Sequence, residues 1–173
     1  MSMIAEYVRV TAAELERAVK DPEWASDFID ELIEEELSDE ADETGRSEPA
    51  QSRSLDIDTA WDALGFLLRR RDFPVDITRG EESVPGADDW GYGPPRYLTP
   101  PQVEVAAAAL AELTGEELIA GVTAQELARA DVYPRVLWER GESLEYVREH
   151  FTALVSFFQA AALDGNGMLI WLD

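Results

Sequence analysis

The hydrophobic positions of the chain follow two spacings, one typical of strands and the other of helices. Residues 4–10 are rich in β-branched and aromatic side chains, which predicts a strand. Residues 168–172 are uniformly apolar, and a strand that is apolar on both faces belongs in the middle of a sheet or beneath helices on both sides. A further short strand is expected at residues 96–98. We therefore expect both ends of the chain to contribute strands to one sheet.

Helical spacing accounts for most of the remaining sequence. Apolar residues recur at every third or fourth position after Pro22, after Asp58 and from Leu144 to Phe158. Four threonines are each followed, three residues later, by a glutamate or glutamine, the capping-box pattern of a helix start; they are Thr11, Thr99, Thr114 and Thr123. These patterns predict an α+β fold, in which a small, mostly antiparallel sheet with the N- and C-terminal strands is wrapped by about five or six helices.

Two long stretches lack both spacings. Residues 38–54 are dominated by Asp, Glu and Ser, and such a composition cannot bury enough apolar surface to offset the entropy lost on ordering. We expect a flexible acidic loop there, within a single domain that spans residues 1–173. Residues 73–96 contain four prolines and four glycines, which predicts irregular backbone. Trp90 and Tyr92 within this stretch favour a packed loop.

Five motifs follow one another along the chain. They are Leu55–Leu68 (LDIDTAWDALGFLL), Gly93–Pro100 (GPPRYLTP), Tyr133-Pro134 followed by Trp138, Leu144–Val147 (LEYV) and Gly167–Trp171 (GMLIW). In this order and spacing they resemble the YfbM-like family of uncharacterised bacterial proteins, also described as domain of unknown function 1877. The resemblance covers nearly the whole chain, and it implies a fold without an activity. Relatives often carry histidines where this chain has Asp62 and Gly65, and this departure argues against histidine chemistry in the segment.

The chain is strongly acidic, with 37 acidic and 14 basic residues and a net charge of −23. Acidic residues concentrate between Asp27 and Glu48, where Arg46 is the single basic residue. Nucleic-acid affinity rests largely on cations that displace condensed counterions, so direct nucleic-acid binding is not expected. Two interpretations of the acidic segment remain open: a surface that attracts a basic partner or mimics nucleic acid towards one, and a solvated helix face that keeps the protein dissolved.

Metal and thiol chemistry are restricted by composition. The sequence has no cysteine and one histidine, His150, which excludes thiolate chemistry and zinc sites built from cysteine or several histidines. Two sets of carboxylates could hold Mg²⁺ or Ca²⁺, namely Asp56, Asp58 and Asp62, and Asp88 with Asp89. In a calcium loop that starts at Asp56, the glycine and glutamate positions are occupied by Trp61 and Leu67. We expect no metal and no other cofactor.

Location and catalysis are also restricted. The sequence has no apolar run of about 18 residues and no basic region followed by an apolar segment at the N-terminus, so we expect a cytoplasmic protein without membrane contact. A Ser-His-Asp set, a nucleophile elbow and a glycine-rich phosphate loop are not recognisable. The sequence therefore favours a protein that is not an enzyme.

Aromatic residues and one arginine are the best candidates for a binding site. Tyr, Trp and Arg are enriched at recognition hot spots, although Tyr and Trp also serve as core and loop anchors. A buried carboxylate beside them would have a raised pKa and could act as a base, or it could be a satisfied polar group in a first helical turn. The expected binding residues are Trp61, Asp62, Arg96, Tyr97, Tyr133 and Trp138.

Two classes of function remain open from the sequence. The first is a non-enzymatic cytoplasmic interaction protein, such as an inhibitor or immunity-type partner of a basic protein. The second is a small-molecule-binding protein or hydrolase with a pocket around Asp62, Arg96 and Tyr97. A deep cleft with a desolvated carboxylate near Arg96 would favour the second class, and a flat or filled surface would favour the first.

Overall fold

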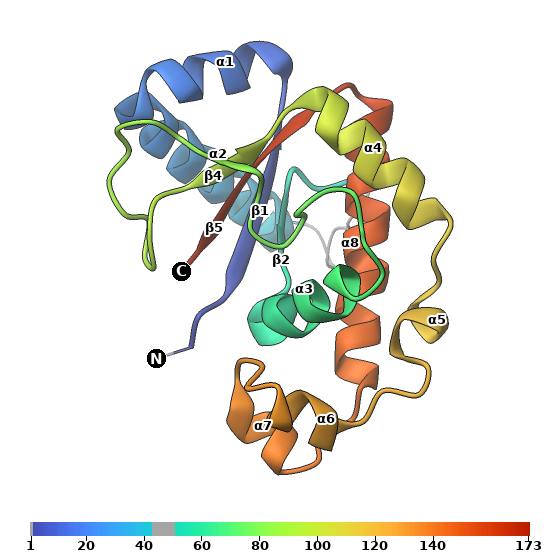
Figure 1. Ribbon diagram of the computed structural model, residues 1–173. Coiled ribbons are helices and arrows are strands. Elements are labelled where there is room, and N and C mark those ends of the chain that lie inside the picture. The colour runs from blue at the N-terminus through green and yellow to red at the C-terminus, as the bar shows by residue number, and fades with distance from the viewer. Residues whose placement is uncertain (1, 43–50) are drawn as a thin grey trace.

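The centre of the fold is an antiparallel sheet. The computed structural model describes residues 2–42 and 51–173 (Figure 1). Its strands are β1 (Ala5–Val10), β2 (Ser54–Asp56), β3 (Glu82–Ser83), β4 (Arg96–Leu98) and β5 (Gly167–Leu172). They lie in the order β2-β1-β5-β4-β3, and every pairing is antiparallel. The predicted α+β fold, with the N- and C-terminal strands in one mostly antiparallel sheet, is confirmed.

Strand β5 lies in the middle of the sheet, as its uniformly apolar sequence predicts. All six of its residues are buried. Because side chains alternate along a strand, Met168 and Ile170 enter the core on one face, while Leu169 and Trp171 enter a separate core on the other. The central position of β5 therefore follows from a strand that has apolar side chains for both faces.

The larger core lies between the sheet and helices α3 (Trp61–Arg69), α4 (Pro100–Ala111) and α8 (Glu145–Leu163). Figure 1 shows α8 alongside the sheet, with α4 and α3 next to it. Tyr7 of β1 is fully buried here, and its aromatic ring packs against the rings of Phe157 and Phe158 in T-shaped geometry. Its hydroxyl donates a 2.7 Å hydrogen bond to the carbonyl of Ile77, which satisfies the polar end of an otherwise apolar site.

The opposite face of the sheet is covered by α1 (Ala12–Lys20) and α2 (Pro22–Asp42). The predicted capping box at Thr11 is present: its hydroxyl accepts from the Glu14 amide at 3.1 Å, and the Glu14 carboxylate accepts from the Thr11 amide at 2.8 Å. Asp21 caps α2 by accepting from the Trp24 amide at 3.1 Å. The strand-to-helix connection at the start of the chain thus has the local structure that its sequence predicts.

The rest of the helical structure is short. A 3₁₀ turn, η1 (Asp58–Ala60), precedes α3, and the segment after α4 forms α5 (Gly115–Ile119), α6 (Ala124–Arg129) and α7 (Arg135–Glu139). The described residues contain eight α-helices, where about five or six were expected, and α7 is a helix whose start has no capping side chain. Over residues 2–42 and 51–173, none of the helices is both long and apolar enough to cross a membrane.

The predicted acidic loop at 38–54 needs correction at both ends. Helix α2 continues to Asp42, and β2 begins at Ser54, while residues 43–50 lie outside the described residues. Glu36 explains why the C-terminal end of the predicted loop is ordered. Its carboxylate accepts hydrogen bonds from the Ser52 hydroxyl at 3.0 Å, from the Arg53 amide at 2.5 Å and from the Ser54 hydroxyl. A carboxylate inside the acidic segment therefore fixes the backbone that leads into β2.

Candidate functional site

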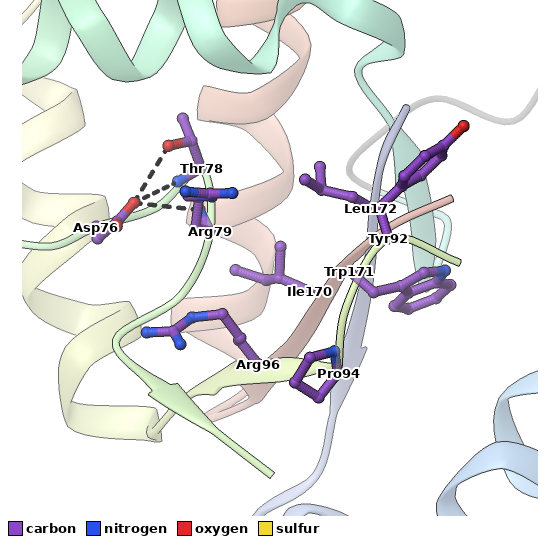
Figure 2. Close-up of a pocket in the computed structure, with 9 residues that line it drawn as sticks. All are labelled: Asp76, Thr78, Arg79, Tyr92, Pro94, Arg96, Ile170, Trp171 and Leu172. Carbon is purple, nitrogen blue, oxygen red and sulfur yellow. Dashed lines mark hydrogen bonds between the residues drawn. The ribbon is translucent and has the colours of Figure 1, made fainter. Parts of the chain in front are cut away.

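A cavity of about 390 Å³ lies beside the C-terminal end of β5 (Figure 2). We call it the β5 cavity. Its walls come from β5, from β4 with the loop before it, and from the loop that follows α3. The lining residues are Asp76, Thr78, Arg79, Tyr92, Pro94, Arg96, Ile170, Trp171 and Leu172.

The loop after α3 is held by Asp76. One oxygen of its carboxylate accepts from the Thr78 amide at 3.3 Å, from the Thr78 hydroxyl at 3.1 Å and from the Arg79 amide at 3.1 Å (Figure 2). Such a turn fixes the backbone on which the next side chain is carried. Gly80 follows with a φ of +90°, and a Cβ there would lie 3.1 Å from Cβ of Arg96. Only glycine adopts this conformation without strain, so the loop can approach β4 closely.

Arg96, on β4, lines the β5 cavity. It pairs with Ile170 in the sheet register. Its guanidinium donates to the Gly80 carbonyl at 3.2 Å, to the Glu81 carbonyl at 3.1 Å and to the Ser83 hydroxyl at 2.8 Å. All three acceptors are neutral, so within the described chain the positive charge of Arg96 is held in place without a carboxylate partner.

Arg79 is the second cation of the β5 cavity. Its Cζ atom lies 5.5 Å from the ring centroid of Trp61, a cation–π distance. Among residues 2–42 and 51–173, Arg79 has no ion pair. Among the described residues, the only carboxylate that lines the β5 cavity is Asp76, and one of its oxygens is occupied by three hydrogen bonds. The cavity therefore has two cations against one anion, in a chain with a net charge of −23.

Three of the site residues predicted from the sequence, Trp61, Asp62 and Tyr133, lie together beside Arg79. The rings of Trp61 and Tyr133 stack with centroids 5.7 Å apart. The Trp61 indole donates to the Met3 carbonyl at 2.9 Å, and the Tyr133 hydroxyl accepts from the Met3 amide at 2.8 Å. The Asp62 carboxylate accepts from the Tyr133 amide at 2.8 Å. These contacts join the N-terminal segment, α3 and the segment before α7, so their first role is to hold the fold together.

The other three predicted site residues lie apart from this group. Tyr97 faces the α1/α2 side of the sheet, opposite to Arg96, and its hydroxyl donates to Glu82 at 2.8 Å; that hydrogen bond raises the pKa of Tyr97. Trp138 is 1% exposed in the larger core. The six residues thus do not form one site, and Arg79 is the residue that connects Trp61 with the cavity at Arg96.

Sequence reasoning missed Arg79, Ile170 and Leu172 as cavity residues. The segment from Asp76 to Arg79 has the Asp-x-Thr pattern of an Asx turn, which signals an ordered loop. That pattern does not indicate which strands the loop faces, because both β4, which it contacts, and β5, across the cavity, come later in the chain.

A desolvated carboxylate is present on β1, outside the β5 cavity. Burial raises the pKa of Glu6 to about 7, and the negative charges of Asp56 and Asp173 add to this effect. Glu6 lies opposite Asp56 and Trp171 in the sheet register and does not line the β5 cavity. In the part of the chain that the structure describes, no group of three or more carboxylate or histidine side chains is arranged to hold a metal ion.

A second surface of interest is the outer face of α2. It carries exposed carboxylates that have no ion pair in the described residues, namely Glu23, Asp27, Asp30, Glu31, Glu34, Glu35 and Asp39. A hollow of about 300 Å³ lies at its second half. We call it the acidic hollow, and its lining residues are Phe28, Glu31, Leu32, Glu35, Glu36, Asp39 and Arg53. Its floor is partly apolar and its rim is mainly anionic.

Comparisons with known proteins identify the family. One solved structure that the chain resembles is "The Crystal Structure of a Protein of Unknown Function YfbM from Escherichia coli", with 19% sequence identity and a TM-score of 0.60 over 99% of this chain and 100% of that chain. At this identity the likeness shows a shared fold. Curated protein sequences give no match. The sequence matches the family described as "Domain of unknown function (DUF1877)" over residues 1–171, and the chain therefore belongs to this family.

Proposed function

We propose that this protein is a non-enzymatic interaction protein whose helix α2 binds a basic partner protein, in the manner of an inhibitor or an immunity protein. The observation that carries the proposal is the acidic hollow, because it combines an apolar floor with several carboxylates. The proposed setting is the cytoplasm, which suits a sequence without cysteine.

The acidic hollow matches the side chain of an arginine or lysine. These side chains bury an aliphatic stem on apolar surface and keep the charged head in a polar environment. Phe28 and Leu32 supply the apolar surface, and Glu31, Glu35 and Asp39 supply carboxylates one helical turn apart. Hydrogen bonds between a cationic donor and a carboxylate are among the stronger ones in proteins. Arg53 also lines the hollow, but its ion pair is with Glu14, and within the described residues Glu31, Glu35 and Asp39 form no ion pair that a cationic partner would have to displace.

The rest of α2 supports capture at a distance. A surface with one sign of charge raises the rate at which an oppositely charged partner is met, and this effect weakens as salt rises. The exposed acidic residues before the hollow, from Glu23 to Asp30, extend the negative field along the helix. Phosphate groups of nucleic acids and lipids are repelled by such a surface.

A hydrolase centred on Asp62, Arg96 and Tyr97 is less well supported. The Asp62 carboxylate is occupied by the Tyr133 amide, and Tyr97 and Arg96 face opposite sides of β4. Glu6, the carboxylate with a pKa of about 7, does not line the β5 cavity. The carboxylate that lines that cavity, Asp76, holds the backbone of its own loop through three hydrogen bonds, which favours binding over catalysis.

The proposal is tested with a short oligo-arginine peptide and a variant that carries Glu31→Gln, Glu35→Gln and Asp39→Asn. We expect the association rate measured by stopped-flow fluorescence to fall by at least about tenfold, because the field at the hollow is lost. The salt dependence of the rate should weaken in parallel.

The matched control removes the same charge elsewhere. Glu104, Glu112 and Glu149 are exposed and form no ion pair with any described residue, and all three are replaced by glutamine. If the control variant slows capture as much as the α2 variant does, net charge alone explains the binding and the proposed site on α2 is refuted.

A further inference from the structure

We propose that the β5 cavity binds a small organic anion, with its charged group against Arg79 and Arg96 and its apolar body on Ile170, Leu172 and Tyr92. This site is independent of the acidic hollow, which lies on the other side of the sheet. The charged group is a carboxylate or a phosphate, since the guanidinium group of arginine suits both.

The first argument is the charge of the lining. In the part of the chain that the structure describes, two guanidinium groups share the β5 cavity with a single carboxylate. Carboxylates outnumber cations more than twofold in the sequence, yet within the described chain neither Arg79 nor Arg96 is in an ion pair. A cationic cavity in such an acidic protein is the opposite of what composition favours, and an anionic ligand would supply the missing counter-charge.

The second argument is that both arginines are held in advance. Arg96 is fixed by three hydrogen bonds to the segment from Gly80 to Ser83, and these use three of its five N–H donors. Arg79 rests over the Trp61 ring, and its backbone is fixed by Asp76. A side chain that is already ordered loses less conformational entropy on binding, so more of the interaction energy contributes to affinity.

The third argument is the apolar wall. In the view of Figure 2, Arg79 and Arg96 lie on one side of Ile170, and Tyr92, Pro94 and Trp171 lie on the other. Tyr92 is 43% exposed, so its ring is accessible to a ligand. Its amide donates to the Leu172 carbonyl at 2.8 Å, which keeps its backbone at the end of β5. A cavity of about 390 Å³ has room for a small ring or chain beside the charged group.

The negative charge of the whole molecule does not outweigh these contacts. At physiological ionic strength, exposed charges are largely screened beyond a distance of about 8 Å. The acidic face of α2 lies across the sheet from the β5 cavity. Local cations in contact with the ligand therefore decide the binding, and the experiment is best done at physiological salt.

Four probes separate the two parts of the ligand. Phenylacetate and phenyl phosphate carry a ring with an anionic group, phenylacetamide carries the ring alone, and inorganic phosphate carries the charge alone. Binding is followed by chemical-shift changes of backbone amides in residues 76–80 and 90–93. We expect one or both ring anions to bind at this place, with affinity at least roughly tenfold above that of phenylacetamide and of inorganic phosphate. The stronger of the two ring anions identifies the anionic group.

Variants separate the arginine contact from a general effect of charge. Arg79→Gln should lower the affinity for the ring anions roughly tenfold. The fold should persist, because the Arg79 guanidinium makes no hydrogen bond to the described residues. Arg140→Gln is the control, since Arg140 is exposed, forms no ion pair among the described residues and does not line the β5 cavity. Tyr92→Ser keeps the backbone N–H donor. It should lower the affinity for the ring anions and leave the affinity for inorganic phosphate unchanged.

Three results would overturn the proposal. One is that neither ring anion shifts the amides of the two loops. Another is that phenylacetamide binds as well as phenylacetate, which would remove the role of charge. The third is that Arg79→Gln and Arg140→Gln weaken binding equally. The outcome does not bear on the acidic hollow, because neither variant alters α2.

Discussion

At the residue scale, Glu6 is a group whose ionisation the fold opposes. It lies on β1 between strands β2 and β5, opposite Asp56 on one side and Trp171 on the other. Partial burial and two nearby negative charges raise its pKa from 4.5 to about 7. A raised pKa means that the folded state binds a proton more tightly than the unfolded state does, so the contribution of Glu6 to stability falls as pH rises from about 4.5 to about 7.

Replacing Glu6 with glutamine should therefore stabilise the protein at high pH. Above a pH of about 7 the variant should have a larger free energy of unfolding than the parent, and the gain should shrink steadily as pH falls towards 5. Urea unfolding at several pH values measures this difference, with Glu104→Gln as the control for loss of one charge at an exposed position. A gain for Glu6→Gln that stays constant over this range would show that Glu6 ionises normally in the fold.

At the element scale, the loop before β4 shows how closely backbone segments approach at the β5 cavity. Gly91 has a φ of +98°, and a Cβ at this position would lie 2.6 Å from the carbonyl oxygen of Leu172. Gly93 has a similar φ of +106°, but a Cβ there would meet nothing within 4 Å. The two glycines therefore separate the cost of the backbone conformation from the cost of contact with β5.

Gly91→Ala should destabilise the protein more than Gly93→Ala does. Both changes force a residue with a Cβ into positive φ, which costs about 1–2 kcal/mol, and Gly91→Ala adds a clash with backbone that cannot rotate away. Thermal unfolding of the two variants measures the difference. Equal losses of stability in the two variants would mean that the loop can shift away from β5 at little energetic cost. Tyr92 would then not be firmly positioned at the β5 cavity.

Elements with a local cause could be predicted from the sequence. The capping boxes at Thr11 and Thr99 start α1 and α4 as expected, and the apolar run at residues 168–172 is the central strand. Local composition did not indicate that residues 52–54 are ordered, because the Glu36 carboxylate that binds this segment belongs to α2. The candidate site was predicted only in part for the same reason: Arg96 lines the cavity, but its companion Arg79 and its wall on β5 come from distant segments.

At the scale of the whole molecule, charge acts against compactness. The net charge is −23 for 173 residues, and a folded state brings like charges closer together than an unfolded chain does. On α2, Glu31, Glu35 and Asp39 succeed one another at four-residue spacing, and each like-charge pair of this kind costs about 0.2–0.5 kcal/mol. Screening by salt should reduce both penalties.

Stability should therefore increase with ionic strength. The urea midpoint should rise between low and physiological salt, and it should rise less for the Glu31→Gln, Glu35→Gln, Asp39→Asn variant, which has lost these like-charge pairs. The pair of salt titrations tests this at neutral pH. A midpoint that does not change with sodium chloride in the parent would mean that self-repulsion is already relieved by the ion pairs in the fold.

The position of β5 in the sheet also affects how the chain can fold. Strand β5 pairs with both β1 and β4, and outside the strand pairing itself Ile4 and Asp173 exchange backbone hydrogen bonds of 2.9 and 2.8 Å. The contacts of β5 with β1, and those of Ile4 with Asp173, join residues separated by almost the whole described sequence, and so long a loop has to close before the strands can pair. During synthesis, β1 and β4 leave the ribosome without the strand that lies between them. The pairing of β1 with β5 therefore has to wait for β5, and until then the backbone N–H and C=O groups on this edge of β1 stay open to other chains.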